Sequence, residues 1–274
     1  MGDISSYEGK RVAIVGCRSG MGAACARRLI ALGAEVHGAD IAPSPIAMAS
    51  FTTVDLRSWP SIDRAVTHIG GEIDALFNCA GLPQTHAAAD VVAVNYLGTR
   101  HWTEQWLPRM RPRGAIASIS SLGGMGYPAK LAMLMPLIEI SDHDEFHAWM
   151  ASNPESVGDG YALSKELINL WSCVEAVKQA PKGIRINTTM PGPTQTPMMT
   201  EFEKILPPKL LEMFTAPSGR RAMAEEQAHA LVFLNSDAAS FISGVCLPVD
   251  SGFFAGVSTG LLDVEAMMAE ATAS

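Results

Sequence analysis

The sequence predicts an α/β protein with one doubly wound parallel sheet of about seven strands and helices on both faces. Short apolar runs alternate with segments of helical periodicity along almost the whole chain. Parallel strands need crossover connections of this length, and these lie over the faces of the sheet. The 274 residues suit one large domain, because no internal repeat, low-complexity tract or linker divides them.

In the first half, strands are expected where apolar runs end in small or polar residues, and helices where apolar residues recur at helical spacing. Ser58 is suited to cap a helix, and Pro108 to end one. In chain order, the expected elements are a strand at 11–16, a helix from the glycine loop to 33, strands at 34–40 and 51–56, a helix at 58–69, a strand at 73–81 and a helix at 90–110.

The second half continues the alternation, with strands expected at 114–121, 183–193 and 244–252 and helices at 160–179 and 224–235. Two long stretches, 122–159 and 194–221, interrupt it. Both follow the carboxyl end of a strand, where open α/β sheets bind ligands. Loops of this length are usually functional or mobile, so both are predicted to be substrate-side insertions of a single domain spanning 1–274.

Composition excludes several classes of function. The net charge of −8 and the absence of a basic run argue against nucleic-acid binding. No apolar stretch reaches the ~18 residues of a membrane span, and the first residues do not form a signal peptide, so a cytoplasmic protein is expected. The opening Met-Gly-x-x-x-Ser matches the loose myristoylation pattern, but nothing polybasic follows it.

No metal site is expected. The five cysteines lack metal-ligand spacing, and we interpret them as buried thiols in a reducing compartment. His143 and His147 would share a helix face, but Asp144 stands where a zinc-protease motif has glutamate. A solvated helix is the simpler interpretation of this stretch.

A glycine loop follows the first strand and opens the first helix. Gly16, Gly20 and Gly22 form Gly-x-x-x-Gly-x-Gly in this strand–helix context. Glycines here let the backbone approach a pyrophosphate, and the helix N-terminus offers free N–H groups. The loop therefore predicts dinucleotide binding.

Asp40, which ends the second strand, indicates which dinucleotide binds. A carboxylate there accepts hydrogen bonds from the adenosine ribose and repels a 2′-phosphate, which favours NAD over NADP. Arg18 and Arg57 are nearby and could reach a 2′-phosphate, so use of NADP stays open.

Tyr161 and Lys165 stand four residues apart in "GDGYALSKEL" and would share one helix face. An ammonium group one turn away would lower the tyrosine pKa from about 10 and suit the phenol to acid–base catalysis. A surface tyrosine packed on a lysine stem is the alternative for the pair taken alone.

Together with further motifs, this pair gives the chain a resemblance to the short-chain dehydrogenases/reductases, from Arg11 to about Gly252. The glycine loop stands first, and the matching residues after it are Asn78 to Gly81 as Asn-Cys-Ala-Gly, Asn95, Ser121, Tyr161, Lys165, Pro191 and Gly192. The departures, Val15 before the loop, Cys79 for alanine and "VDSG" after the last strand, remove no reacting group.

The chain looks most like the bacterial 3α-hydroxysteroid dehydrogenase/carbonyl reductase subgroup. The marks are "NCAGLPQT", the long insertion between Ser121 and Tyr161, and the C-terminal run from Ala216 to Gly244. Coniferyl-alcohol-type dehydrogenases share these features. The resemblance implies a Rossmann-like fold and an NAD-dependent oxidoreductase that interconverts secondary alcohols and ketones on hydroxysteroids or similar bulky cyclic substrates.

Other activities stay open: oxidation of aryl alcohols, terpene alcohols or cis-dihydrodiols, and, more remotely, non-catalytic dinucleotide sensing. The resemblance implies that Tyr161 is the acid–base, that Lys165 also holds the nicotinamide ribose, and that Asn95 holds a water that relays protons. An asparagine that only bonds local backbone is the alternative for Asn95. Ser121 would orient the substrate oxygen, with Ser120 as its competitor. A homo-oligomer, dimer or tetramer, is expected, and the first insertion would favour the dimer.

Two sets of contacts are expected. The cofactor contacts are Gly16, Arg18, Ser19, Gly20, Met21, Gly22, Asp40, Asp55, Leu56, Asn78, Ala80, Gly81, Tyr161, Lys165, Pro191, Gly192, Thr194 and Thr196. The substrate contacts are Ser121 and Tyr161 together with apolar residues of the two insertions, namely Leu122, Met125, Met198 and Met199, in a wall to which Tyr127, Met133, Met135, Phe202 and Met213 could add. Packing of the insertions onto the body of the protein is the alternative for these apolar residues.

Overall fold

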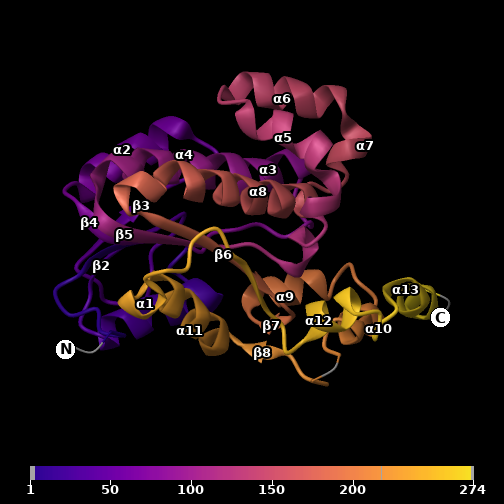
Figure 1. Ribbon diagram of the computed structural model, residues 1–274. Helices are drawn as coiled ribbons and strands as arrows, with labels where there is room; N and C mark the ends of the chain where they lie inside the picture. Colours follow the sequence, from indigo (N-terminus) through magenta and orange to yellow (C-terminus); the bar gives the residue numbers. More distant parts are fainter. Residues whose placement is uncertain (1–3, 217, 273–274) are drawn as a thin grey trace.

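Seven parallel strands form one sheet in the computed structural model, which describes residues 4–216 and 218–272 (Figure 1). This confirms the predicted fold class. The strand order reverses between β1 and β4, so the carboxyl ends of these two strands flank a crevice. From one edge to the other the strands are β3 (Ser50–Thr53), β2 (Glu35–Asp40), β1 (Arg11–Val15), β4 (Ile73–Asn78), β5 (Met110–Ile119), β6 (Arg185–Pro191) and β9 (Cys246–Val249).

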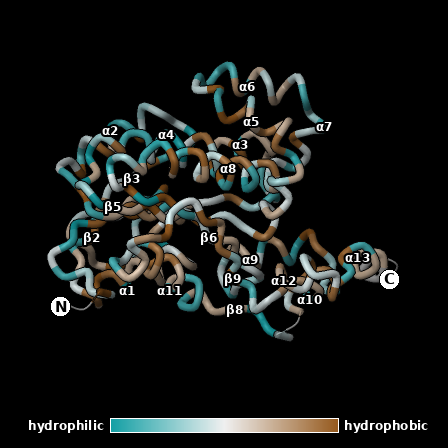
Figure 2. The backbone as a smooth tube through the Cα atoms, viewed as in Figure 1, coloured by the Kyte–Doolittle hydropathy of each residue, from teal (hydrophilic) through white to brown (hydrophobic). Residues whose placement is uncertain are grey.

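Helices cover both faces of the sheet. One face carries α2 (Trp59–Ile69), α4 (Thr99–Trp106) and α8 (Tyr161–Gln179), and the other carries α1 (Gly20–Ala31) and α11 (Ala224–Asn235). Successive residues of β1 enter opposite cores, because side chains alternate along a strand and both faces are covered. In Figure 2 brown segments lie inside the molecule, and teal appears on the outer helices α2, α4 and α6 as well as on turns.

The predicted helix over 90–110 is divided into four pieces. It consists of α3 (Ala88–Val92), a π-helical turn η1 (Ala93–Gly98), α4, and a 3₁₀ turn η2 (Leu107–Arg109) that contains Pro108. β5 then begins at Met110, earlier than predicted, because a register shift opposite Ile73 and Ala75 and the positive φ of Arg113 accommodate extra residues.

The first predicted insertion is mainly helical. It holds the 3₁₀ turns η3 (Leu122–Gly124) and η4 (Tyr127–Lys130), followed by α5 (Leu131–Glu139), α6 (His143–Ser152) and α7 (Pro154–Val157). Leu134, Leu137 and Phe146 pack in one apolar cluster with Leu167 of α8. The helix expected around His143 and His147 is present as α6, whereas the rest of the stretch was expected as a loop and is mostly helical, with α5 packed on α8 (Figure 1).

The second insertion and the C-terminal region lie together on the other side of the molecule (Figure 1). The insertion contains β7 (Thr194–Gln195), α9 (Pro197–Phe202) and α10 (Pro208–Met213), and β7 pairs with β8 (Ala222–Met223). Two helices not predicted from the sequence, α12 (Phe253–Ser258) and α13 (Val264–Thr272), follow β9, and α13 packs against α10. No helix within the described residues could cross a membrane.

Gly98 allows the end of η1 to pack tightly against the segment after β3. A Cβ atom at Gly98 would lie 2.0 Å from the backbone oxygen of Leu56. A Gly→Ala change inside a helix normally stabilises by up to about 1 kcal/mol. For Gly98→Ala we expect the opposite sign, a loss of about 1–3 kcal/mol in the free energy of unfolding, because the backbone must move.

Urea unfolding measures this difference, with Ala89→Gly at an exposed position of α3 calibrating the helix-propensity effect alone. A Gly98→Ala protein as stable as the parent chain, or more stable, would show that η1 does not depend on this contact.

Candidate active site

The glycine loop lies in the crevice at the carboxyl ends of β1 and β4. A Cβ atom at Gly16 would lie 2.3 Å from the backbone nitrogen of Ala80, and one at Gly22 would lie 2.0 Å from the oxygen of Gly16. Larger residues cannot occupy either position. The loop borders a cavity of about 300 Å³, here called the glycine-loop cavity. The predicted cofactor contacts that line it are Gly16, Ser19, Gly20, Met21, Gly22, Asp40, Asp55, Leu56, Ala80, Gly81 and Thr196.

Acidic side chains dominate the end of this cavity near β2. One carboxylate oxygen of Asp40 accepts a hydrogen bond from the Arg18 backbone nitrogen at 2.9 Å. Arg57 forms two hydrogen bonds with Asp55, at 2.8 and 3.0 Å, and its guanidinium lies 3.7 Å from Asp90. Its charge is therefore already paired, which weakens the case for a 2′-phosphate site.

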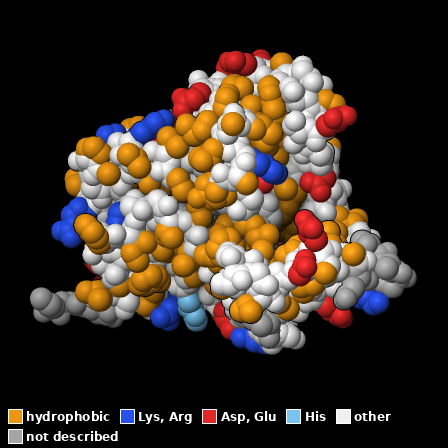
Figure 3. Space-filling view, turned by 45° about the vertical axis from the view of Figure 1, so that its right-hand side comes forward, with side chains coloured by type: hydrophobic (Ala, Val, Ile, Leu, Met, Phe, Trp, Pro, Cys, Tyr) orange, Lys and Arg blue, Asp and Glu red, His pale blue; other side chains and the backbone are white. Residues whose placement is uncertain are grey.

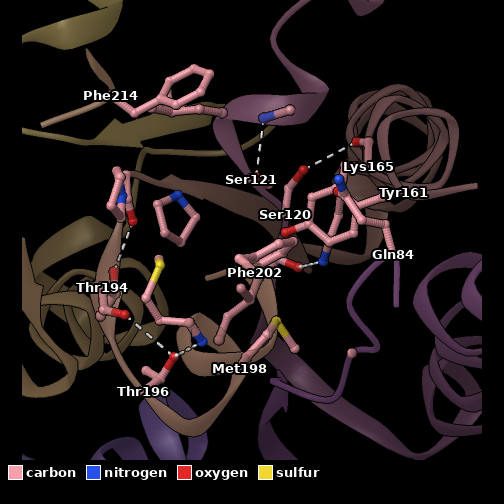
Figure 4. Close-up of a pocket in the computed structure, with 18 of the residues that line it drawn as sticks. Gln84, Ser120, Ser121, Tyr161, Lys165, Thr194, Thr196, Met198, Phe202 and Phe214 are labelled. Atoms are coloured by element: carbon pink, nitrogen blue, oxygen red, sulfur yellow. Dashed lines mark hydrogen bonds between the residues drawn. The ribbon is translucent and has the colours of Figure 1, made fainter. Parts of the chain in front are cut away.

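A second cavity, of about 330 Å³, adjoins the first and is here called the Tyr161 cavity (Figure 4). Ser121 is the second residue after the end of β5, and a 3.0 Å hydrogen bond from the Gly123 nitrogen fixes its hydroxyl oxygen. Tyr161 is the first residue of α8, and Lys165 lies one turn further. Ser120 instead donates to the Lys165 carbonyl oxygen at 3.1 Å, so Ser121 is the serine that is hydrogen-bonded with Tyr161.

The electrostatics of the pair differ from the sequence-based expectation. Burial raises the pKa of Tyr161, the hydrogen bond with Ser121 opposes this, and the charge of Asp159 adds to the rise. Burial also lowers the pKa of Lys165 to about 8. The prediction that Lys165 lowers the pKa of Tyr161 is thus wrong for the protein without a bound dinucleotide. The lysine nitrogen donates to the Ile119 oxygen at 3.0 Å instead, and it lies 5.7 Å from the centre of the phenol ring.

Asn95 lies in the π-helical turn η1 and links two parts of the site. Its amide makes hydrogen bonds of 2.7 and 3.0 Å with the backbone of Leu82 and one of 3.3 Å with the Ser164 hydroxyl, which donates to the Tyr161 carbonyl oxygen. π-Helical turns often occur at functional sites. The side chain holds backbone in place here, and the predicted water relay stays a prediction.

Several predicted contacts lie elsewhere. Asn78 is buried and joins β4 to Thr103 and Ser118 at 2.9 and 3.0 Å, so its side chain holds the sheet and α4 together outside both cavities. Arg18 also lies outside both linings and supplies its backbone nitrogen to Asp40. Pro191, Gly192 and Thr194 line the Tyr161 cavity with Tyr161 and Lys165.

The wall of the Tyr161 cavity is mostly apolar, and Figure 3 shows hydrophobic side chains around a hollow in this region. The predicted Leu122, Met198, Met199 and Phe202 line it, and the Phe202 ring packs edge-on against Tyr161. Sequence reasoning missed further lining residues, because only the folded chain brings them here: Gln84, Asp159, Leu206, Leu210, Leu211, Phe214 and Met268.

The other methionines and the tyrosine expected in this wall do not reach it. Met125 packs beside Leu122 and Met190, outside the lining. Tyr127 lies 3.8 Å from the sulfur atoms of Cys173 and Cys246, and Met133 packs in the cluster between α5 and α8. The other two predicted positions outside the lining are Met135, which is exposed, and Met213, which is buried.

The two histidines of the first insertion lie side by side on α6. The rings of His143 and His147 lie 4.3 Å apart on α6, but no group of His, Cys, Asp and Glu suited to a metal ion occurs within residues 4–216 and 218–272. All five cysteines are free thiols.

Comparisons with known proteins agree with this geometry. A family model described as short chain dehydrogenase matches residues 10–133, and one described as enoyl-(acyl carrier protein) reductase matches 149–254. A coniferyl-alcohol dehydrogenase of Pseudomonas sp. (strain HR199 / DSM 7063) is 34% identical over 89% of this chain and 96% of its own. A 3-alpha-hydroxysteroid dehydrogenase/carbonyl reductase of Comamonas testosteroni is 31% identical over 88% and 95%.

Solved structures of similar proteins share this fold. The 3-alpha-hydroxysteroid dehydrogenase from Pseudomonas sp. B-0831, complexed with NADH, superimposes with a TM-score of 0.76 at 29% identity, covering 91% of this chain and 98% of that one. Levodione reductase superimposes with a TM-score of 0.70 at 27% identity, covering 91% and 99%.

The buried Lys165 makes stability depend on pH. The pKa of Lys165 in the folded chain, about 8, lies below its ordinary value of 10.5. Between these two pH values the unfolded chain binds more protons than the folded chain. The contribution of Lys165 to the free energy of unfolding therefore rises with pH from about 8 to 10.5. We expect Lys165→Met to be more stable than the parent chain at pH 7, by at most about 3 kcal/mol. This advantage should shrink as the pH rises from about 8 to 10.

Urea unfolding of both proteins at several pH values tests this prediction. The control is Lys182→Met at an exposed position, which should show no such pH-dependent difference. A constant difference between Lys165→Met and the parent chain would contradict the expected cost of the buried charge.

Proposed function

The chain belongs to the short-chain dehydrogenase/reductase family, and we propose that it oxidises alcohols of bulky, mainly apolar ring compounds with NAD, or reduces the corresponding ketones. The observation that carries this proposal is the convergence of Ser121, Tyr161 and Lys165 at one end of an apolar cavity. That cavity shares part of its lining with the glycine-loop cavity, so a substrate and a dinucleotide could meet there: the shared residues are Met21, Cys79, Ala80, Gly81, Thr196 and Met198.

The glycine-loop cavity fits a dinucleotide. Gly16 and Gly22 leave no room for a side chain, which lets a pyrophosphate approach the backbone at the N-terminus of α1. Asp40 has one oxygen bound to Arg18 and another that can accept from ribose hydroxyls, and its charge disfavours a 2′-phosphate. NAD, when bound, supplies the hydride acceptor for alcohol oxidation.

The proposed acid–base chemistry belongs to this chain's own residues. The Ser121 hydroxyl hydrogen-bonds the substrate oxygen, while the Gly123 nitrogen keeps it in place. Tyr161 takes the hydroxyl proton during oxidation and returns it to the carbonyl oxygen during reduction. Because its pKa is raised, the phenol is protonated near neutral pH, which favours ketone reduction there and alcohol oxidation at alkaline pH.

Two substrate classes compete. Hydroxysteroids are the first candidate, since the apolar wall from α9, α10 and α13 suits a large ring system and a relative 31% identical is named for them. Aryl alcohols are the second, because the relative named for coniferyl alcohol is 34% identical. We also propose that the protein is cytoplasmic and forms a dimer or tetramer. Residues 194–221 are proposed to contact the substrate.

The test is NADH formation by the purified chain with NAD and NADP in parallel, against hydroxysteroids, aryl alcohols, monoterpenols and cis-dihydrodiols. We expect turnover with NAD of at least one class, and a loss of about 100- to 10,000-fold in kcat for Tyr161→Phe, because the proton acceptor is removed. NADH binding, measured by fluorescence, serves as the folding control. Equal turnover by Tyr161→Phe would refute the assigned role of the tyrosine.

Asp159 gives a prediction about pH. Its carboxylate accepts from the Tyr161 backbone nitrogen at 2.9 Å, and its negative charge helps to raise the tyrosine pKa. Asp159→Asn keeps an acceptor oxygen and removes the charge, so the tyrosine pKa should fall. The alkaline rise of the oxidation rate should then move to lower pH, by less than about one unit.

The measurement is kcat/KM for oxidation as a function of pH. Asp144→Asn on the outer helix α6 removes an equal charge from an exposed side chain and should leave the profile where it is. A shift of the Asp159→Asn profile to higher pH would contradict the prediction.

A further inference from the structure

The mostly apolar lining of the Tyr161 cavity includes a glutamine whose side chain makes no hydrogen bond within the described residues. Gln84 lies on the loop between β4 and α3 and faces this cavity together with Ser121 and Tyr161 (Figure 4). No group in the described part of the chain is hydrogen-bonded to its amide. A glutamine amide offers an acceptor oxygen and two N–H donors, and all of them are available here.

The other neutral polar side chains of the lining are already engaged. Ser120 donates to the Lys165 carbonyl oxygen, and Ser121 accepts from the Gly123 nitrogen. Thr194 donates to the Gly192 oxygen at 2.8 Å, and Thr196 donates to the Thr194 oxygen at 3.3 Å. Among the described neutral side chains of this lining, apart from the residues proposed to act on the reacting oxygen, Gln84 thus has both its donors and its acceptor free for a ligand.

The loop that carries Gln84 is held in place. Asn95 binds both backbone polar groups of Leu82, the next residue, Pro83, is buried, and the nitrogen of His86 donates to the Pro83 oxygen at 3.3 Å. Gln84 is therefore the second residue of a tight turn. The side chain is presented from a fixed backbone, which lowers the ordering cost of a contact with substrate.

Gln84 lies at the reacting end of the cavity. A Cβ atom at Gly81 would lie 3.8 Å from the Lys165 nitrogen, and three residues span at most about 10 Å. In Figure 4, Gln84 lies on the side of Tyr161 and Lys165, whereas Phe214 lies at the opposite end. If Ser121 and Tyr161 hold the reacting oxygen of a ring, the substituents next to that oxygen would lie beside Gln84. The apolar part of the ring system would then extend toward Phe214.

We propose that Gln84 is a specificity residue that hydrogen-bonds a second oxygen on the reacting ring, so that preferred substrates are cyclic diols, hydroxyketones or diones. This inference rests on the proposed function. A substrate with a single oxygen would cover the amide without pairing it, and an unpaired buried polar group costs about 1–3 kcal/mol. That cost corresponds to a preference of about 5- to 150-fold for the substrate with two oxygens.

A matched series of ring ketones tests the inference. NADH-dependent reduction of 1-tetralone is compared with that of its 2-hydroxy and 4-hydroxy derivatives, which differ by one hydroxyl. The parent chain should show a kcat/KM at least about 5-fold higher for one hydroxylated ketone. Gln84→Met, which has similar length and no amide, should bring this ratio to about one, mainly by slowing the hydroxylated substrate.

The control variant is Met198→Leu, which changes the apolar wall of the same cavity without changing its polarity. It should affect all three ketones by similar factors. A ketone that is not reduced is tested as a competitive inhibitor of the oxidation of the best alcohol of the panel. The ratio of the inhibition constants of the two ketones then takes the place of the kcat/KM ratio.

The outcomes separate the two proposals. Turnover with an unchanged preference in Gln84→Met, or no preference in the parent chain, overturns the role of Gln84 and leaves the proposed function intact. The absence of turnover with every ketone and every alcohol of the panel overturns both. A preference that is lost in Gln84→Met and kept in Met198→Leu supports the inference.

Discussion

The site depends on the close contact between the end of β5 and the first two turns of α8. The Lys165 nitrogen donates to the Ile119 oxygen, and Ser120 donates to the Lys165 carbonyl oxygen. A Cβ atom at Gly124 would lie 2.6 Å from that carbonyl oxygen, so only glycine permits the helix to lie so near. This contact places Tyr161 beside Ser121, and the same burial that secures it shifts the pKa values of Tyr161 and Lys165 in opposite directions.

Asn95 extends this arrangement to the neighbouring strand. The hydrogen bonds of its side-chain amide connect the loop after β4 to Ser164 in the first turn of α8. One buried side chain therefore holds the loop of Gln84 in place beside the helix of Tyr161. Buried polar groups are costly unless they are paired, and both polar atoms of this amide are paired. The π-helical turn η1, which carries Asn95, thus helps to position the residues of the site.

The sheet, the glycine loop and the Tyr161–Lys165 pair could be predicted, because each leaves a local signal in spacing or residue type, and Ser121 was assigned through the family resemblance. A helix was expected around His143 and His147, but α5 was not, since Pro136 lies inside it and packing on α8 stabilises it. Met268 reaches the cavity only through tertiary packing. The sign of the tyrosine pKa shift also depends on where the Lys165 nitrogen points, which spacing alone does not reveal.

The two ends of the Tyr161 cavity come from different parts of the fold. Its reacting end is formed by the sheet and α8, whereas α9, α10 and α13, which supply most of the far wall, lie outside the sheet and its cores. Substitutions in the wall therefore leave the main cores intact. Selection can change which molecules this protein accepts at little risk to folding, so its substrate range can diverge quickly among descendants that retain the same chemistry.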